Sequence, residues 1–212
     1  MGLWGTGGSF AGSSEAKPKH LTTAEKREVF ATKSGWTRRV GIHSGQGKAS
    51  DQTTASWAAV QDEVLVAIGN LSETVTAEGV GLGVATISSM NWNTTTISKA
   101  AGATLDFTIN YNEEVTVTGF PTLSVSGTGG RNHVCSMIAG VVNEHGSGTN
   151  RLRFRRVVAA NSATWNADDV LQIEANKLQH NSSTIVDAVG GATAEITHAA
   201  QLATMGSLTV AA

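Results

Sequence analysis

Few side chains in this sequence have the type and spacing that catalysis needs. His133 and Cys135 are two residues apart in an extended run, so both lie on one face of the expected strand. A cysteine–histidine nucleophile also needs a hydrogen bond between the two side chains and a third group that orients the histidine. Cys135 is the only cysteine, which excludes an intramolecular disulfide and a cysteine-rich zinc site. We therefore interpret Cys135 as a small core residue.

Other motifs that carry chemistry are missing from the sequence. The six histidines are scattered, and no G-x-S-x-G, P-loop or dinucleotide-binding glycine motif occurs. We predict that the chain is not an enzyme and holds no cofactor or metal. One alternative stays open for metal: Asp168, Asp169 and Asp187 lie near expected strand ends, where β-sandwiches sometimes bind calcium, and they suit turns equally well.

A row of basic residues follows at Arg151, Arg153 and Arg155, alternating with Leu152 and Phe154. The alternation predicts a strand with its apolar residues directed inward and its arginines outward. Such a row could bind a polyanion or an acidic partner. It could also be a solvated sheet face that pairs with Asp or Glu on the neighbouring strand.

The strands that must position these groups are clearest between residues 103 and 127. Leu105, Phe107, Ile109 and Tyr111 alternate with polar residues, which predicts a strand with one buried face. We interpret 112–114 (N-E-E) as a turn. The alternation then resumes over 115–118 and again after Pro121. Short strands rich in Thr and Val, separated by turns, are typical of an antiparallel β-sandwich.

Composition agrees with an all-β chain. Of the 212 residues, 40% are apolar, 15% are charged, 24 are glycine and only two are proline, which favours strands and tight turns over long helices.

The formal net charge of −2 gives no global attraction to nucleic acid or anionic membrane, and we predict neither as a partner. The sequence has no run of 18 apolar residues and no signal-peptide pattern at its start, so we expect no membrane segment.

The N-terminal part has a different character. Residues 1–20 are rich in Gly and Ser and predict a flexible arm. Thr22 and Glu25 form a capping box at the start of a short helix. Residues 35–42 and 57–68 then predict a hairpin, whose second strand is buried on both faces or paired in an interface. We expect an attachment module over 21–70, a Gly-rich linker over 71–83 and an immunoglobulin-like β-sandwich over 84–212.

We expect the arm and the module to contact a partner. Residues 1–50 carry eight Lys or Arg against three Glu, so this part of the chain could dock on an acidic surface or form a solvated basic arm. Large apolar side chains on a flexible segment can order in the pocket of a neighbouring subunit. The candidate contact residues are Leu3, Trp4, Phe10, Lys17, Lys19, Trp36, Arg38 and Arg39.

Two stretches resemble known families. The run L-D-F-T-I-N-Y-N-E-E-V-T-V-T-G-F-P-T-L-S-V, residues 105–125, resembles the opening strands of a bacterial and phage immunoglobulin-like repeat, and I-V-D-A-V-G-G, residues 185–191, is similar to the D-A-A-G-N turn near the end of such repeats. Gly191 replaces the usual Asn, which weakens the inference of a calcium-binding turn. The resemblance covers residues 86–197.

The second resemblance covers residues 3–69 with gaps. L-W-G, K-x-L-T-x-x-E-K-x-x-V-F and E-V-L-V-A-I-G look like the start of small virion proteins of tailed phages of marine bacteria. It implies a structural protein that is assembled in the host cytoplasm and resides in the virion. The expected partners are the major capsid protein or other virion subunits, with further copies of the chain.

We expect a capsid decoration (cement) protein. The alternatives are a neck or tail protein of fibre-like or adhesive type, and a carbohydrate-binding β-sandwich.

Overall fold

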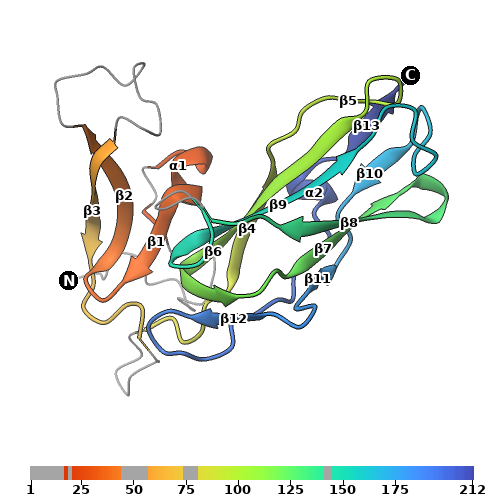
Figure 1. Ribbon diagram of the computed structural model, residues 1–212. Helices are drawn as coiled ribbons and strands as arrows, with labels where there is room; N and C mark the ends of the chain where they lie inside the picture. Colours follow the sequence, from red (N-terminus) through yellow and green to blue (C-terminus); the bar gives the residue numbers. More distant parts are fainter. Residues whose placement is uncertain (1–16, 19–20, 44–56, 74–80, 141–144) are drawn as a thin grey trace. The chain divides into compact units, whose positions relative to one another are not determined.

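The computed structural model describes residues 17–18, 21–43, 57–73, 81–140 and 145–212 (Figure 1). Within these ranges the chain forms thirteen strands, two short α-helices and one 3-10 turn, so the predicted all-β class is confirmed. The chain divides into two compact units, unit 1 over residues 1–83 and unit 2 over residues 84–212. Each unit is described by itself. No helix among the described residues has both the length and the apolar character needed to cross a membrane.

Unit 1 begins with the helix α1 (Thr23–Glu28) and continues into β1 (Val29–Thr32). The predicted capping box is present: the Thr22 backbone N–H donates to the Glu25 carboxylate at 2.9 Å, and the Glu25 N–H donates to the Thr22 hydroxyl at 3.3 Å. These bonds satisfy two of the N–H groups that a helix leaves unpaired at its start. They explain why a helix of six residues begins at this point.

The predicted hairpin of unit 1 consists of β2 (Gly35–His43) and β3 (Trp57–Ala67), which pair antiparallel. β1 pairs with the other edge of β2, and the strand order is β3-β2-β1. Gly35 permits the tight turn between β1 and β2 because its φ of 129° is rarely adopted by other residues, and a Cβ there would lie 2.1 Å from the Val66 carbonyl oxygen.

Among the described residues of unit 1, the buried apolar cluster consists of Val29, Ala31, Trp36, Leu71 and Leu82, with Leu21, Leu65, Val66 and Ile68 packed against it. Leu71 and Leu82 belong to the segment that we expected to be a linker, and the Leu82 N–H donates to the Leu71 carbonyl at 2.9 Å. Both described ends of that segment are therefore part of unit 1.

Unit 2 contains the remaining strands, which we give with their bounds: β4 (Ile87–Trp92), β5 (Ile97–Ser98), β6 (Ala103–Thr118), β7 (Thr122–Gly127), β8 (Arg131–Met137), β9 (Thr149–Val158), β10 (Val170–Gln172), β11 (Leu178–Gln179), β12 (Thr184–Asp187) and β13 (Leu208–Ala211). The 3-10 turn Thr128–Gly130 joins β7 to β8, and the helix α2 (Leu202–Met205) precedes β13. Residues 194–198 form no strand, and an isolated bridge joins the neighbouring Thr193 to Val186.

The strands of unit 2 follow the order β6-β9-β8-β7-β10-β13-β5. β4 and β12 both pair with β6, and β11 pairs with β7. All pairs are antiparallel except β13 with β5, which is parallel. The long strand β6 is the central element because it contacts β4 and β9 along its first half and β12 along its second half.

The turn predicted at residues 112–114 is wrong. β6 continues through these residues without a break. Its pairing with β9 shifts between Asn110 and Val115, where β6 carries extra residues that have no partner on β9. A bulge of this kind absorbs polar residues without ending a strand. The consequence is that Glu113 lies between the buried residues Tyr111 and Val115 and is itself fully buried.

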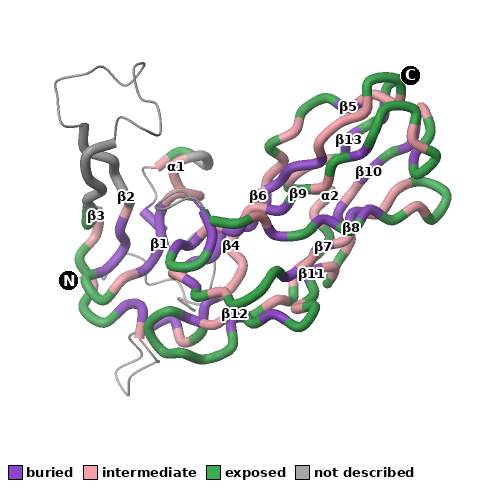
Figure 2. Tube along the Cα trace, in the orientation of Figure 1, coloured by how far each residue is buried: buried purple, intermediate pink, exposed green. Residues whose placement is uncertain are grey.

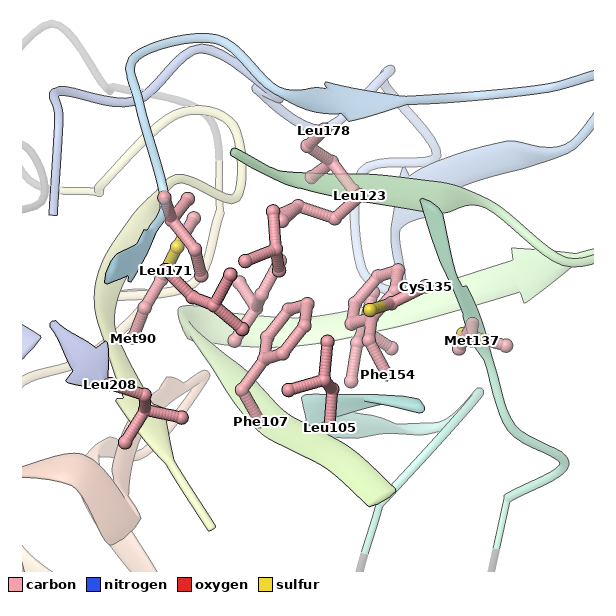
Figure 3. Packing of buried hydrophobic residues seen from close by; sticks show 14 of the residues in the cluster. Met90, Leu105, Phe107, Leu123, Cys135, Met137, Phe154, Leu171, Leu178 and Leu208 are labelled. Atoms are coloured by element: carbon pink, nitrogen blue, oxygen red, sulfur yellow. The ribbon is translucent and has the colours of Figure 1, made fainter. Parts of the chain in front are cut away.

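One continuous core fills unit 2. It receives buried side chains from all ten strands, so the inward faces of the sheet must surround it. Figure 3 shows residues from several strands converging there, and the rings of Phe107 and Phe154 stack with centroids 5.5 Å apart. In Figure 2 the buried residues of this unit concentrate on the strands and the exposed ones on the connecting loops.

Candidate interaction surface

The outward face of β4, β6 and β9 carries a connected set of polar side chains. The register places Asp106 opposite Arg155, Thr108 opposite Arg153 and Asn110 opposite Arg151. Because residues that face one another across an antiparallel pair point to the same side of the sheet, these side chains share one surface. We call it the outer face.

Asp106 is the centre of the outer face. Its carboxylate is 5% exposed and accepts five hydrogen bonds. Arg153 donates to both oxygens at 2.8 Å, Arg155 donates twice to Oδ2 at 2.9 and 3.0 Å, and the Asn93 amide donates to Oδ1 at 2.7 Å. Burial alone would raise the pKa of Asp106, but the bonds from Arg153, Asn93 and Arg155 outweigh burial and hold the pKa below its ordinary value of 3.8.

The arginine row was interpreted either as a site for a polyanion or acidic partner, or as a sheet face that pairs with the neighbouring strand. The geometry around Asp106 distinguishes these interpretations for Arg153 and Arg155. Arg153 and Arg155 pair with a carboxylate on the neighbouring strand, as the structural interpretation requires. The amide of Asn110 extends the same network by donating to Ser89 Oγ at 3.0 Å and Asn91 Oδ1 at 3.1 Å. The outer face is therefore a rigid polar surface that ties β4, β6 and β9 together.

A second group of polar side chains is buried at the end of β6. Glu113 is fully buried, and neither of its carboxylate oxygens has a hydrogen-bond partner. Asp187 of β12 is 1% exposed; its Oδ1 accepts from the N–H groups of Val189 and Gly190 at 2.7 and 3.1 Å, whereas its Oδ2 has no partner. Burial, and then the charge of Asp187, raise the pKa of Glu113 to about 8.

The candidate nucleophile is not activated in the structure. His133 and Cys135 share the inward face of β8 and are both fully buried, and the Cys135 thiol donates to the backbone carbonyl of His133 at 3.7 Å rather than to its ring. Burial raises the pKa of Cys135 to about 12. Burial also lowers the pKa of His133, and the charge of Arg156 lowers it further. A protonated, inaccessible thiol beside a neutral imidazole is what a core position produces.

The aspartates considered for calcium serve the fold locally. Asp169 pairs with Arg131 at 3.3 Å and accepts the Asn166 N–H at 2.6 Å, and Asp168 occupies a left-handed turn position with φ 66°. Asp187 caps the turn that follows β12. Within the described ranges no group of three or more His, Cys, Asp or Glu is placed to hold a metal ion.

Only part of the predicted contact set lies in the described part of unit 1. Lys17 is 3% exposed, and its ammonium donates to the Lys26 carbonyl at 2.7 Å. Trp36 is 2% exposed and belongs to the buried apolar cluster of unit 1 with Val29, Leu71 and Leu82. Neither side chain is available as a surface contact in this chain. Arg38 pairs with Glu28 at 2.5 Å.

The other predicted contacts lie outside the described part. Leu3, Trp4, Phe10 and Lys19 precede it or fall in a gap, and the side chain of Arg39 is not described either.

The strand β3 bears on the expectation that the second strand of the hairpin is buried on both faces or paired in an interface. The run V-L-V-A-I, residues 64–68, spans the end of β3. Leu65, Val66 and Ile68 are half-buried and pack against the apolar cluster of unit 1, whereas Val64 and Ala67 are exposed. Val64 is 44% exposed. Among the described strands β3 pairs only with β2, and a register shift opposite Trp36 and Thr37 skips Leu65. We call residues 62–68 the β3 surface.

No known protein family, curated protein or solved structure matches this chain.

Proposed function

We propose that the chain is a structural protein of a phage particle, and specifically a capsid decoration protein that docks through its first unit. The observation that carries the proposal is the β3 surface. Val64 is exposed there and Leu65, Val66 and Ile68 beside it are only half-buried, so this stretch offers apolar surface that a partner subunit could cover. Its partner would be the major capsid protein or another virion subunit, with further copies of the chain beside it.

The contrast between the two units supports a docking role for unit 1 and a different role for unit 2. Unit 1 has a sheet of three described strands, and a sheet of so few strands gains stability from a surface that covers it. Unit 2 has its own extensive core and a polar outer face fixed by the Asp106 network. We infer that unit 2 is an immunoglobulin-like sandwich that projects from the particle or braces a neighbour, and that it has no catalytic role.

A neck or tail location would use the same docking surface and differ in number of copies. Quantitative mass spectrometry of purified particles separates these locations, because a decoration protein is present in hundreds of copies and a neck or tail protein in a few tens or fewer. Deleting residues 1–19 should abolish incorporation into particles if the arm contributes to anchoring.

A matched pair of variants tests the β3 surface directly. Val64 and Val134 are 44% and 46% exposed, and they lie in different units. We expect Val64→Lys to reduce incorporation of the full chain into particles at least about tenfold, because burying an unpaired ammonium in an apolar contact costs more than 1.4 kcal/mol. Val134→Lys should incorporate normally. Equal incorporation of the two variants would remove the support for docking through β3.

One alternative function has an observation in its favour. The outer face carries the exposed side chains of Asn93 and Arg155 and the half-exposed Thr108, and amide, guanidinium and hydroxyl groups can hydrogen-bond a carbohydrate. Binding of the purified chain to a glycan array, lost on Asn93→Ala, would favour this carbohydrate-binding function over a purely structural one.

A further inference from the structure

The end of β6 in unit 2 contains buried carboxylates that the proposed docking function does not use. Glu113 belongs to the bulged part of β6, and Asp187 ends β12. Asp187 lies opposite Val115, and Glu113 is two residues from Val115 on the same strand, so the two carboxylates are diagonal neighbours across the β6–β12 pair. Diagonal neighbours are about 7 to 8 Å apart at their Cα atoms, a distance that an acidic pair can span.

Three carboxylate oxygens of this pair have no hydrogen-bond partner: both oxygens of Glu113 and Oδ2 of Asp187. Burying even one unpaired carboxylate charge is costly, and burying two facing charges is more so. A single bound proton lowers both of these costs. It neutralises one carboxyl group, and the O–H of that group can donate a hydrogen bond to an oxygen of the other carboxyl group.

Asp187 also controls the local backbone. Its Oδ1 holds the N–H groups of Val189 and Gly190, and the Ala188 N–H donates to the Glu114 carbonyl at 3.0 Å. The Asp187 N–H in turn donates to the Ala192 carbonyl at 2.8 Å. The turn over residues 187–192 is therefore attached to β6 at the residue next to Glu113, so repulsion between the two carboxylates acts directly on this attachment.

Other titratable groups lie at this end of the unit. Tyr111 and Glu114 belong to β6, His145 precedes β9, and Glu195 follows β12. Glu114 and His145 have partners of their own, and the charge of Glu195 acts on Tyr111. The charge that acts on Glu113 is that of Asp187, and burial raises the pKa of Glu113 in the same direction.

We propose that Glu113 and Asp187 share one proton in the folded unit, and that losing this proton loosens the 187–192 turn from β6. The pair is then a pH-sensitive latch, closed at neutral pH and weakened in alkaline conditions. The inference does not depend on where the protein docks, because every group involved belongs to unit 2.

Hydrogen exchange of the full chain, measured by mass spectrometry between pH 6.5 and pH 9 and corrected for intrinsic exchange, tests the latch. In the wild type we expect protection of the peptides covering 111–115 and 187–192 to fall at least about tenfold across this range, since Glu113 becomes charged as the pH rises above its raised pKa. Glu113→Gln should remove this dependence, because its amide can donate to Asp187 as the protonated carboxyl does. Glu195→Gln, at an exposed position of the same unit, should behave as the wild type.

Three results would overturn the proposal. One is protection in the wild type that does not change with pH. Another is the same pH dependence in the wild type and in Glu113→Gln. The third is a wild type that becomes pH-sensitive only after a chelator is added, which would show that a cation and not a proton neutralises the pair.

Discussion

The most informative single substitution in unit 2 is Asp106→Asn. It keeps the size of the side chain and removes the charge that Arg153 and Arg155 share. Asp106 is almost fully buried, whereas the side chains of Arg153 and Arg155 are 32% and 40% exposed. Water can therefore replace part of what the arginines lose, and the substitution is less harmful than breaking a fully buried ion pair.

The size of the effect follows from these exposures. Removing one partner of a buried pair costs about 3 to 5 kcal/mol, whereas exposed pairs contribute about 0 to 1 kcal/mol. The Asp106 network lies between these limits, and the Asn carbonyl can still accept a hydrogen bond. We expect a loss of about 2 kcal/mol in the free energy of unfolding of unit 2 at pH 7.

The pH dependence of this loss has a definite sign. Because the pKa of Asp106 is lower in the folded than in the unfolded chain, its stabilisation is fully present above the unfolded value of 3.8 and is lost as the pH falls through the folded value. The difference between wild type and Asp106→Asn should therefore be largest at neutral pH and shrink in acid.

Urea unfolding of both proteins at pH 7 and in acid, followed by hydrogen exchange of the β6 and β9 peptides, measures the effect. Asp168→Asn is the matched control, because Asp168 is exposed and its left-handed conformation suits Asn equally well. A double-mutant cycle with Arg153→Gln should show coupling, and a cycle with Arg156→Gln should not, because Arg156 contacts the Val134 carbonyl instead. A loss at pH 7 no greater than that of the control would refute the reasoning.

Three further substitutions test the packing of each unit. Trp36→Ala should destabilise unit 1 by about 3 to 5 kcal/mol and leave the exchange protection of unit 2 unchanged, because a large buried ring is lost from the buried apolar cluster of unit 1. Phe107→Ala should cost unit 2 a similar amount, about 3 to 5 kcal/mol, through loss of its stack on Phe154, and should leave unit 1 unchanged. Gly35→Ala should destabilise the β1–β2 turn by more than about 1 kcal/mol, since its Cβ would clash with the Val66 carbonyl, whereas Gly69→Ala, with open space around its Cβ, serves as the control. Hydrogen exchange resolved by unit checks all three, and a loss that spreads equally over both units would contradict their separate cores.

Local sequence patterns correctly predicted structural features that depend on residues close together along the chain. The capping box at Thr22 and Glu25 marks the start of α1, and the alternation from Leu105 to Tyr111 identifies the buried face of β6. These features follow from hydrogen bonds and side-chain periodicity within a few residues, so one sequence is enough to find them.

Features that depend on distant partners were predicted poorly. The N-E-E run of residues 112–114 has the composition of a turn, but its backbone bonds to distant segments: the Asn112 N–H donates to the Thr86 carbonyl, and the Glu114 carbonyl accepts from the Ala188 N–H. Trp36 was predicted to be a contact because aromatic and basic residues together suggest an interface, but its burial depends on Leu71 and Leu82 far along the chain.

The Asp106 network shows the same limit at the candidate surface. The alternation predicted the outward arginines, and a carboxylate partner on the neighbouring strand was one of two interpretations. Which carboxylate it is depends on the β6–β9 register, which the sequence does not reveal.

Because we propose that the chain decorates a phage capsid, a density map of the corresponding particle tests the central claim most directly. We predict density for the chain at many equivalent positions on the shell, with residues 62–68 in contact with a shell subunit and residues 84–212 projecting away or bridging to a neighbour. Particles that lack the chain, or that hold it with the β3 surface facing solvent, would contradict docking through the first unit.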